Sequence, residues 1–401
     1  MVDSSSVILY EPQCSGFEHA AFNAAVLQTL ALAQPDRRLV FIAEGQHLFH
    51  VREACIRAGC TGFETIEWQE IAIPPRGLAG WRRLRRELIL CHAIVNKASS
   101  PKVQAVILCS LTDTGLLVLK TLLGVRRTAP VLAVLHGILS SLERPQPTRP
   151  WNWATHLRQV LRLPHPKQLT YLALGGSIYS SLVVAMPQAV SHFRVLDPPY
   201  FMDGTVSAVD SHTRIRFGYF GVGRNAEKAF DQFVRLAQEA RAMPGRHESE
   251  FLIVGHVQAG RGDPPLHPQV IQGACRAPLS LDEYRCRART VTYAVSLADP
   301  AHYRLAASAS FLDALCYSKP GIYLRNPYVE YYFDCMGDIG YLCDSYAEVR
   351  DVVLSLIQKF PEARYRQQCQ NIRNGRLRFE PQAVAPRLLD IVKECQEALD
   401  N

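Results

Sequence analysis

Short apolar runs recur along the chain, and each is followed by a polar turn and then by a stretch with helical periodicity. A short apolar run bounded by turn residues indicates a buried β-strand, whereas apolar positions three or four residues apart indicate a helix. In the first half the pattern predicts helices at 20–33, 50–58 and 115–123, and strands at 7–10, 39–43, 64–68, 105–109, 131–135 and 169–174. Strands that alternate with helices predict a parallel sheet with helices on both faces.

A proline-bearing segment, Leu196-Asp197-Pro198-Pro199-Tyr200, interrupts this rhythm. Proline blocks both helix and sheet, so the segment is predicted to be a stiff linker. After it the rhythm restarts, with strands expected at 214–220, 251–254, 291–296 and 321–324 and helices at 225–241, 281–288, 311–315, 346–359, 363–374 and 382–398.

The predicted fold class is therefore α/β, with two doubly wound Rossmann-like domains facing a central cleft. We expect a first domain at 1–198, a second domain at 199–379, and a terminal helix at 380–401 that packs back on the first domain. Ligands of such sheets bind at the carboxyl ends of the strands, so the turns after the strands are the candidate site.

The stretch 291–326 contains a predicted strand, a turn of small residues, a helix and a second strand. The turn includes Ser308, Ala309 and Ser310. Free backbone N–H groups at a helix N-terminus bind phosphate, and small side chains let a phosphate approach. The alternative is an ordinary turn in which Ser310 caps the helix.

A second turn of interest is Gly221-Val222-Gly223-Arg224, which we expect to open the helix at 225–241. Arg224 and Lys228 are four residues apart and would point from one helical turn toward an anion. As a dinucleotide fingerprint the stretch is weak, because Gly255-His256 follows the next strand where an acidic residue would bind ribose. The alternative is a pair of surface cations.

Three turns of the first half carry candidate catalytic groups. His136 follows the apolar strand 131–135, and a histidine there can accept a proton or bind a sugar hydroxyl. The alternative is a histidine that is hydrogen-bonded within its own loop. Asp113 follows the strand 105–109 as a possible general base or as the N-cap of the helix at 115–123. Glu18 and His19 lie in the loop after the first strand, beside Gly16, and the alternative there is a charge pair at a helix start.

Composition limits the classes of function. The chain has 401 residues and a formal net charge of +7, with 48% hydrophobic and 20% charged residues. It has no apolar run long enough for a transmembrane helix, no signal-peptide pattern and no Asp-x-Asp pair. The 12 cysteines lack C-x-x-C spacing, which predicts free thiols in a reducing cytoplasm and no metal site.

Basic and aromatic residues gather at 81–86, beginning with Trp81, and at 151–167, beginning with Trp151. Arginine with tryptophan on an amphipathic helix is typical of an anionic membrane surface. We expect no nucleic-acid binding, because no known nucleic-acid-binding motif is present. The other interpretation is a pair of solvated helix faces.

With these turns placed, the chain resembles GT-B glycosyltransferases, in particular the large sugar-nucleotide-dependent group (family 4-like) of bacterial polysaccharide biosynthesis. The similarity covers most of the chain and is most specific in the second half. Four segments carry it: Gly221 to Lys228, Leu252-Ile253-Val254-Gly255, Ser308-Ala309-Ser310, and Asp313 to Lys319-Pro320. His136 resembles the family histidine near the donor sugar.

The resemblance implies an acceptor-binding domain at 1–198, a nucleotide-sugar-binding domain at 199–379, a UDP- or GDP-sugar donor, and no cofactor or obligatory metal. It implies donor-binding residues at Gly221, Gly223, Arg224, Lys228, His256, Arg276, Tyr303, Ser308, Ala309, Ser310 and Asp313, with Asp113, His136, Glu18 and His19 as the candidate catalytic residues. The family often has two glutamates eight positions apart. Here these positions hold Leu305 and Asp313, which leaves a retaining or an inverting mechanism open.

The expected function is transfer of a sugar from a nucleotide donor to a glycan or lipid-linked acceptor in surface polysaccharide synthesis. The expected enzyme is a metal-independent hexosyltransferase, cytoplasmic and peripheral at the inner face of the plasma membrane. Two alternatives remain: a non-catalytic GT-B-like protein that binds a glycan or partner, and a sugar-nucleotide epimerase.

Overall fold

The computed structural model describes residues 5–75, 77–202, 214–225, 229–243, 247–258, 265–301 and 303–400. The chain divides into two compact units. Unit 1 comprises Met1–Phe201, Leu305–Ala307 and Arg378–Asn401, and unit 2 comprises Met202–Arg304 and Ser308–Leu377. The proline-bearing segment after Leu196 thus leads from the first unit into the second.

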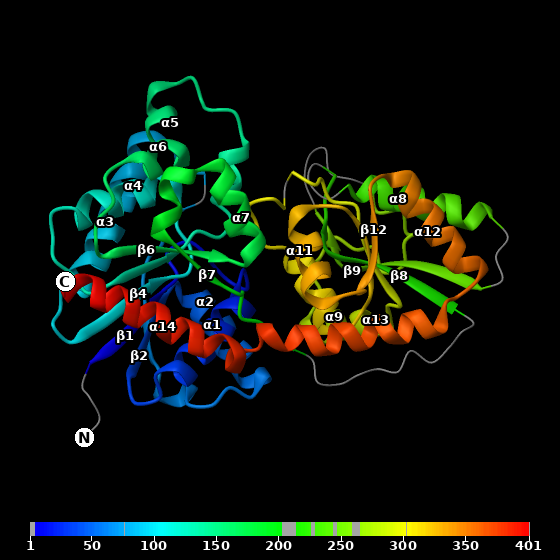
Figure 1. Cartoon of the computed structure of the whole chain (residues 1–401), viewed down its shortest axis with the longest axis horizontal. Coiled ribbons are helices and arrows are strands. Elements are labelled where there is room, and N and C mark those ends of the chain that lie inside the picture. Colours follow the sequence, from blue (N-terminus) through cyan, green and yellow to red (C-terminus); the bar gives the residue numbers. More distant parts are fainter. Residues whose placement is uncertain are drawn as a thin grey trace. The chain divides into compact units, whose positions relative to one another are not determined.

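Unit 1 is built on a sheet of seven parallel strands in the order β3-β2-β1-β4-β5-β6-β7 (Figure 1). The chain winds outward from β1 in one direction and then from β4 in the other, which is the doubly wound topology. The strands are β1 (Ser6–Tyr10), β2 (Arg38–Ala43), β3 (Glu67–Glu70), β4 (Val103–Leu108), β5 (Val131–Val134), β6 (Leu169–Leu174) and β7 (Phe193–Leu196).

Helices of unit 1 follow the strands and cover the sheet. They are α1 (Ala20–Ala33), α2 (Gly45–Ala58), α3 (Gly80–Ala98), α4 (Asp113–Leu123), α5 (Pro150–Ala154), α6 (Leu157–Arg162), α7 (Gly176–Ala185) and α14 (Pro381–Asp400), with short 3₁₀ turns η1 (Phe63–Thr65), η2 (Leu139–Glu143), η3 (Pro187–His192) and η4 (Arg376–Phe379). The start of α2 illustrates the local chemistry. Glu44 precedes the helix and accepts the N–H groups of Gln46 and His47, which have no partner within the helix.

Helix α1 is buried on nearly all sides. Every residue from Asn23 to Leu30 is buried, and eight consecutive residues point in all directions around a helix. The reason is that α14, from the far end of the chain, packs on α1, which itself contacts β2 of the sheet. A helix covered on two faces needs apolar residues all round, which is what the sequence AAFNAAVLQTLALA provides.

Unit 2 is built on a parallel sheet in the order β12-β11-β10-β8-β9. A single parallel bridge from Leu252 to Gln272 extends it beyond β9. With the Gln272 segment placed beside β9, the order Gln272 segment-β9-β8-β10-β11-β12 matches the order β3-β2-β1-β4-β5-β6 of unit 1. The strands are β8 (Arg214–Gly223), β9 (Glu248–Val257), β10 (Tyr293–Ser296), β11 (Gly321–Leu324) and β12 (Gly340–Cys343).

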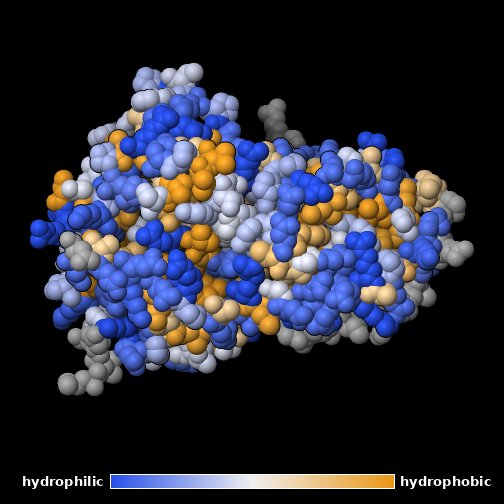
Figure 2. Space-filling model, in the orientation of Figure 1, coloured by the Kyte–Doolittle hydropathy of each residue, from blue (hydrophilic) through white to orange (hydrophobic). Residues whose placement is uncertain are grey.

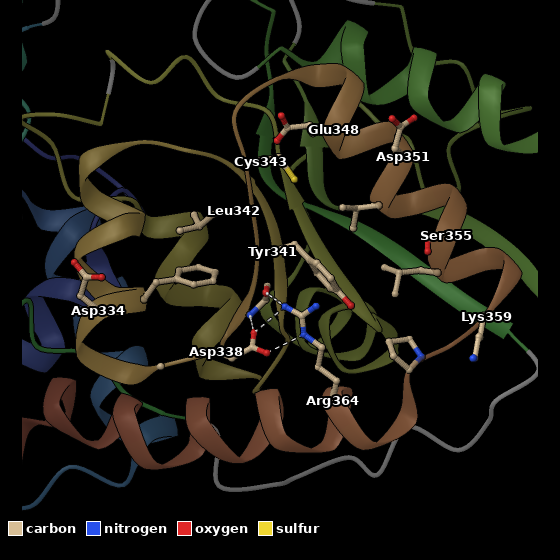
Figure 3. Close-up of a pocket in the computed structure, with 16 residues that line it drawn as sticks. Asp334, Asp338, Tyr341, Leu342, Cys343, Glu348, Asp351, Ser355, Lys359 and Arg364 are labelled. Atoms are coloured by element: carbon tan, nitrogen blue, oxygen red, sulfur yellow. Dashed lines mark hydrogen bonds and ion pairs between the residues drawn. The ribbon is translucent and has the colours of Figure 1, made fainter.

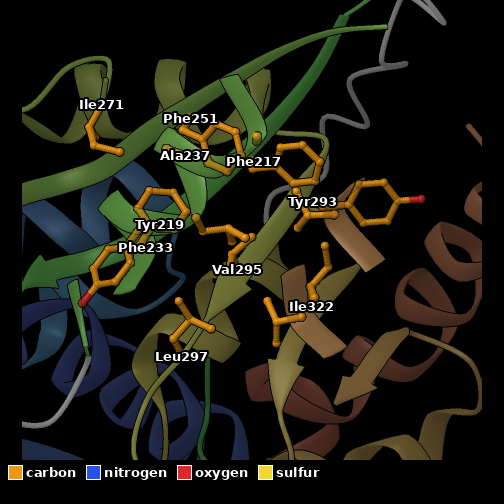
Figure 4. Packing of buried hydrophobic residues seen from close by; sticks show 14 of the residues in the cluster. Phe217, Tyr219, Phe233, Ala237, Phe251, Ile271, Tyr293, Val295, Leu297 and Ile322 are labelled. Carbon is orange, nitrogen blue, oxygen red and sulfur yellow. The ribbon is translucent and has the colours of Figure 1, made fainter. Parts of the chain in front are cut away.

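The core of unit 2 is aromatic. Phe217, Phe251 and Tyr293 stack across neighbouring strands, and Phe233 packs edge-on against Phe251 (Figure 4). Buried aromatic side chains supply much of the apolar area that holds a sheet to its helices. The helices are α8 (Phe230–Ala242), α9 (Leu281–Thr290), α10 (Ala309–Cys316), α11 (Pro327–Met336), α12 (Tyr346–Gln358) and α13 (Glu362–Gly375).

The prediction of two doubly wound parallel sheets is confirmed, but one turn was placed wrongly. Gly221 and Gly223 do not form a turn: β8 continues through both, paired with Gly255 and Val257 of β9. The glycines permit this pairing, because a Cβ on Gly255 would lie 2.1 Å from the carbonyl oxygen of Gly221. Helix α8 starts only at Phe230, so Arg224 is not in its first turn.

Candidate functional site

A polar pocket of about 400 Å³ opens at the carboxyl edge of the sheet in unit 1. The loops after β1, β3, β4 and β5 and one side chain of α3 enclose it. Its lining residues are Gln13, Cys14, Glu18, His19, Pro74, Arg83, Ser110, Leu111, His136, Gly137 and Ile138. Three residues chosen from the sequence therefore meet here: Glu18, His19 and His136.

The imidazoles of His19 and His136 lie edge to face, with ring centroids 5.0 Å apart. Burial, and to a smaller extent the neighbouring His19, lower the pKa of His136 to about 3. Burial also lowers the pKa of His19, although the carboxylate of Glu11 opposes this. Both rings are therefore neutral near pH 7, which is the form of histidine that accepts a proton.

Arg83 also lines this pocket, although it belongs to the basic group at 81–86 that is predicted to face a membrane. Its guanidinium instead turns inward to the buried carboxylate of Glu87, with the Nε atom 2.7 Å from Oε1. Thr112 donates its hydroxyl to the same oxygen. Residue type alone does not indicate this role; the i, i+4 spacing of Arg83 and Glu87 was the available signal.

Asp113 is not among the residues lining the pocket. Thr112, not Asp113, is the N-cap of α4, because the Thr112 hydroxyl accepts the N–H of Gly115. Burial raises the pKa of Asp113 to about 6, while the backbone N–H of Leu157 and the side chain of Ser141 act in the opposite direction. The carboxyl group thus lies toward α6 and η2.

In unit 2 the N-terminus of α10 is formed by the small residues singled out in the sequence. Ser308 is the N-cap, and its hydroxyl accepts the N–H of Phe311 and lies 3.1 Å from the hydroxyl of Ser310. The alternative in which Ser310 caps the helix is wrong. Ala309 is exposed and Ser310 half-buried, so the first turn of the helix is accessible to an anion.

A small hollow lies beside this helix start, at the carboxyl ends of β8, β10 and β11. Tyr303 and Ser310, both predicted to bind the donor, line it together. Tyr219, Ser296 and Tyr323 also line it and were missed in the sequence. These three residues lie in or at the end of predicted strands, and this position could have marked them as candidate site residues.

The loops after β8 and β9 are tied together. The N–H of Gln258 donates to the carbonyl of Gly223, and the guanidinium of Arg276 donates to the carbonyl of Gln258. Arg224 and Arg276 are thereby brought to the same edge of the sheet. His256 lies within β9, half-buried, and burial lowers its pKa. Lys228 lies outside the described residues.

Two residues of the α10 segment contact other helices. The carboxylate of Asp313 accepts the hydroxyl of Tyr284 on α9 at 2.6 Å. Lys319 is almost fully buried, and its ammonium donates to the carbonyl of Arg289 at 2.7 Å. Burial lowers the pKa of Lys319 to about 8. Lys319 therefore anchors the end of the helix. Leu305, at the position where the family often has a glutamate, is buried.

A wider hollow, of about 1020 Å³, lies along the open edge of the second sheet, beside β12 (Figure 3). Asp338 pairs there with Arg364, whose guanidinium also stacks on Tyr341 at 4.3 Å. Arg364 and Gln368 donate to the carbonyl of Gly340 and so cover an edge group of the strand. The hollow lies at the side of the sheet and is lined by none of the predicted donor residues.

The surface of unit 1 bears exposed apolar and basic side chains on α3, where Trp81 is 73% exposed. Val183 and Val184 are exposed on α7, where Figure 2 shows hydrophobic side chains in the otherwise polar surface. Within the described residues, no helix is long and apolar enough to cross a membrane. The same residues include no group of three or more His, Cys, Asp or Glu arranged to hold a metal ion.

Comparisons with known proteins agree with this fold. No protein-family model and no curated protein sequence matches the chain. Among solved structures, Anabaena Alr3699/HepE in complex with UDP and glucose aligns with 97% of this chain and 100% of its own, with a TM-score of 0.63 and 12% identity.

Two further structures align over a similar span. A glycosyltransferase from Rickettsia africae has a TM-score of 0.63 and 11% identity, with 98% of each chain covered. The lipopolysaccharide outer core galactosyltransferase WaaB has a TM-score of 0.61 and 11% identity, with 97% of this chain and 99% of that chain covered. At such low identity these alignments establish the fold, which is the GT-B fold.

Proposed function

We propose that the chain is a glycosyltransferase that moves a sugar from a nucleotide-sugar donor to a glycan or lipid-linked acceptor. The observation that carries the proposal is the polar pocket at the carboxyl edge of unit 1, in which Glu18, His19 and His136 meet. The GT-B neighbours support it, because HepE was solved with UDP and glucose and WaaB is described as a galactosyltransferase. Surface polysaccharide synthesis is the corresponding biological setting.

In this proposal unit 1 binds the acceptor. The lowered pKa values keep the rings of His136 and His19 neutral at neutral pH, which is the protonation state that a general base needs. One of them, or Glu18, removes the proton from the acceptor hydroxyl as that oxygen attacks the anomeric carbon. The geometry favours these pocket residues over Asp113, which lies toward α6.

Unit 2 binds the donor in this proposal. The free N–H groups at the start of α10, with Ser308 and Ser310, face the diphosphate, and Arg224 adds a positive charge. His256, near the end of β9, and Arg276 lie nearest the base in this proposal. These groups stabilise the leaving diphosphate electrostatically, so the reaction as proposed needs no metal ion.

The test measures binding and release separately. Purified protein is titrated with UDP-glucose and GDP-mannose by calorimetry, and then assayed for free UDP or GDP with a bacterial lipid extract as the acceptor source. We expect one donor to bind and to release its nucleotide. Arg224→Ala should weaken donor binding by about tenfold, the loss of one charge-assisted contact. Arg235→Ala, on an exposed side chain of α8 paired with Glu239, is the matched control.

The alternatives give different results. Binding without any release of nucleotide favours a non-catalytic glycan- or partner-binding protein. Conversion of the donor to an isomeric sugar nucleotide without an acceptor favours an epimerase. Failure to bind either donor contradicts the donor site assigned to unit 2.

We further propose that the protein is cytoplasmic and attaches to the inner face of the membrane through α3 and α5. On α3 the exposed side chains include Trp81, Arg82, Arg85 and Arg86. In α5 they include Trp151 and Trp153. Arg158, which belongs to the same basic segment, is not part of this surface, because its guanidinium donates to the carbonyl of Leu142 at 2.9 Å.

A further inference from the structure

The carboxylate of Glu11 lies at the end of β1 with no exposed surface. A carboxylate removed from water must be compensated by hydrogen bonds. Oε1 accepts the N–H groups of Gln13 at 3.0 Å and Cys14 at 3.1 Å, and also the hydroxyl of Ser110. Oε2 accepts the amide of Asn23 at 3.1 Å. Each of these partners is a donor, three of them to Oε1 and one to Oε2.

A second buried group continues the network. The amide of Asn23 also lies 2.8 Å from Nε2 of His47, which has no exposed surface. Nδ1 of His47 lies 2.9 Å from the carbonyl oxygen of Gly16. A carbonyl only accepts, so Nδ1 carries the proton and Nε2 accepts from Asn23. The carboxylate of Glu44 accepts the N–H of Gly16 at 3.3 Å.

These contacts hold the loop between β1 and α1 at its start and in its middle. Glu11, Gln13 and Cys14 fix its start, and the paired contacts to Gly16 fix its middle. The loop ends at His19, whose φ of 56° is in the left-handed region that non-glycine residues rarely adopt. Such a conformation persists only where the surroundings enforce it.

We propose that Glu11 is a positioning residue for the reaction in the unit 1 pocket: through Asn23, His47 and Ser110 it holds the loop so that His19 faces His136. The inference rests on the proposed function and deepens it. Glu11 touches neither histidine by a hydrogen bond, so it acts through the loop. Its negative charge has a second effect, because it raises the pKa of His19 against the effect of burial.

Glu11→Gln tests both effects. Both carboxylate oxygens of Glu11 accept hydrogen bonds. In glutamine one of them is replaced by an NH₂ group, which is itself a donor, so at least one hydrogen bond of the network is lost. We expect kcat to fall about tenfold, with the KM for the nucleotide sugar unchanged, because the pocket but not the donor site is disturbed. The pKa of His19, measured by NMR titration of its imidazole, should fall because the nearby charge is gone. A merely structural role predicts no such fall.

Asn23→Ala separates the two effects and guards against poor folding of the first variant. It keeps the charge of Glu11 but breaks the link to His47, so kcat should fall while the pKa of His19 falls less than in Glu11→Gln. Gln28→Ala is the matched control. Gln28 also joins α1 to the end of α2, by bonds to Thr61, but it lies outside the network. We expect a kcat and a His19 pKa equal to those of the wild type.

The outcomes separate this inference from the proposed function. If the wild type shows no transfer with UDP-glucose or GDP-mannose, the proposed function fails, and the NMR titration still tests whether Glu11 controls His19. A wild-type kcat in Asn23→Ala, or an unchanged His19 pKa in Glu11→Gln, overturns the inference. A lower His19 pKa in Glu11→Gln, with Gln28→Ala unchanged, supports it.

Discussion

At the scale of residues, burial rather than residue type sets the chemistry of the site. His19 and His136 are neutral because their partial burial disfavours the charged imidazolium and lowers the pKa of each ring. Asp113 experiences the same desolvation with the opposite consequence, because burial favours the protonated carboxyl group. The histidines and Asp113 look alike as candidate bases in the sequence, but burial shifts the pKa of the histidines down and that of Asp113 up.

Asp113→Asn should increase the stability of the protein at neutral pH. The folded pKa, about 6, lies above the unfolded value of 3.8, so ionisation of Asp113 costs stability as pH rises through 6. We expect a gain of about 1 kcal/mol in the free energy of unfolding at pH 7.5, a value discounted because the side chain is partly exposed. Denaturant titrations should show this gain shrinking as pH falls toward 4.5. Turnover near the wild-type rate would confirm that Asp113 is not the general base.

His136→Gln should change how stability depends on pH. The folded pKa of His136, about 3, lies below the unfolded value of 6.5, so the unfolded chain binds a proton that the folded chain does not. The wild type should therefore lose stability as pH falls from 6.5 toward 3, and the variant should lose less. Thermal unfolding at several pH values measures this. Parallel curves for the two proteins would contradict the buried, neutral histidine.

At the scale of elements, the structure assigns several sequence signals to packing. Gly221 was predicted to open a turn and Gly255 to end a strand, but both lie within the paired strands and allow β8 and β9 to run side by side. Lys319 anchors the end of α10 to the carbonyl of Arg289. The apolar strands and α1 were predicted well from periodicity. The predictions omitted β7, α11 and β12, because their sequences are short or mixed in polarity.

The terminal helix α14 should be held to unit 1 by its apolar face and not by its ion pairs. Ile391 is fully buried, so Ile391→Ala should reduce the free energy of unfolding by about 2–5 kcal/mol. Glu394 pairs with Arg194 and Arg387, but these side chains are 37–45% exposed. Glu394→Ala should therefore cost less than about 1 kcal/mol. Equal losses in the two variants, measured by denaturant titration, would contradict this ranking.

At the scale of the whole molecule, the chain uses one topology twice. In each unit the order of parallel segments reverses at the first strand, and the candidate groups lie at the carboxyl ends. The GT-B neighbours share this plan over nearly the whole length at 11–12% identity. A fold can persist at such low identity because it depends on the pattern of buried positions more than on residue identity.

The net charge of +7 and the exposed arginines of α3 predict binding to anionic membranes. The protein should sediment with vesicles containing phosphatidylglycerol and remain in the supernatant with phosphatidylcholine alone. Arg85→Glu/Arg86→Glu should abolish sedimentation at 0.15 M salt. Arg350→Glu, on an exposed arginine of unit 2, is the control. If the protein remains in the supernatant when anionic vesicles are sedimented, the membrane-binding surface proposed for α3 is wrong.

The sequence by itself determined the α/β class, the two doubly wound units and the strand ends that carry His136, Glu18 and Ser308. These follow from local periodicity and turn chemistry, which short stretches contain. Only the tertiary structure decided that His19 meets His136, that Arg83 turns to Glu87, and that α14 covers α1. The first and last of these contacts join residues far apart in the chain, and burial, which fixes the pKa values, exists only once they form.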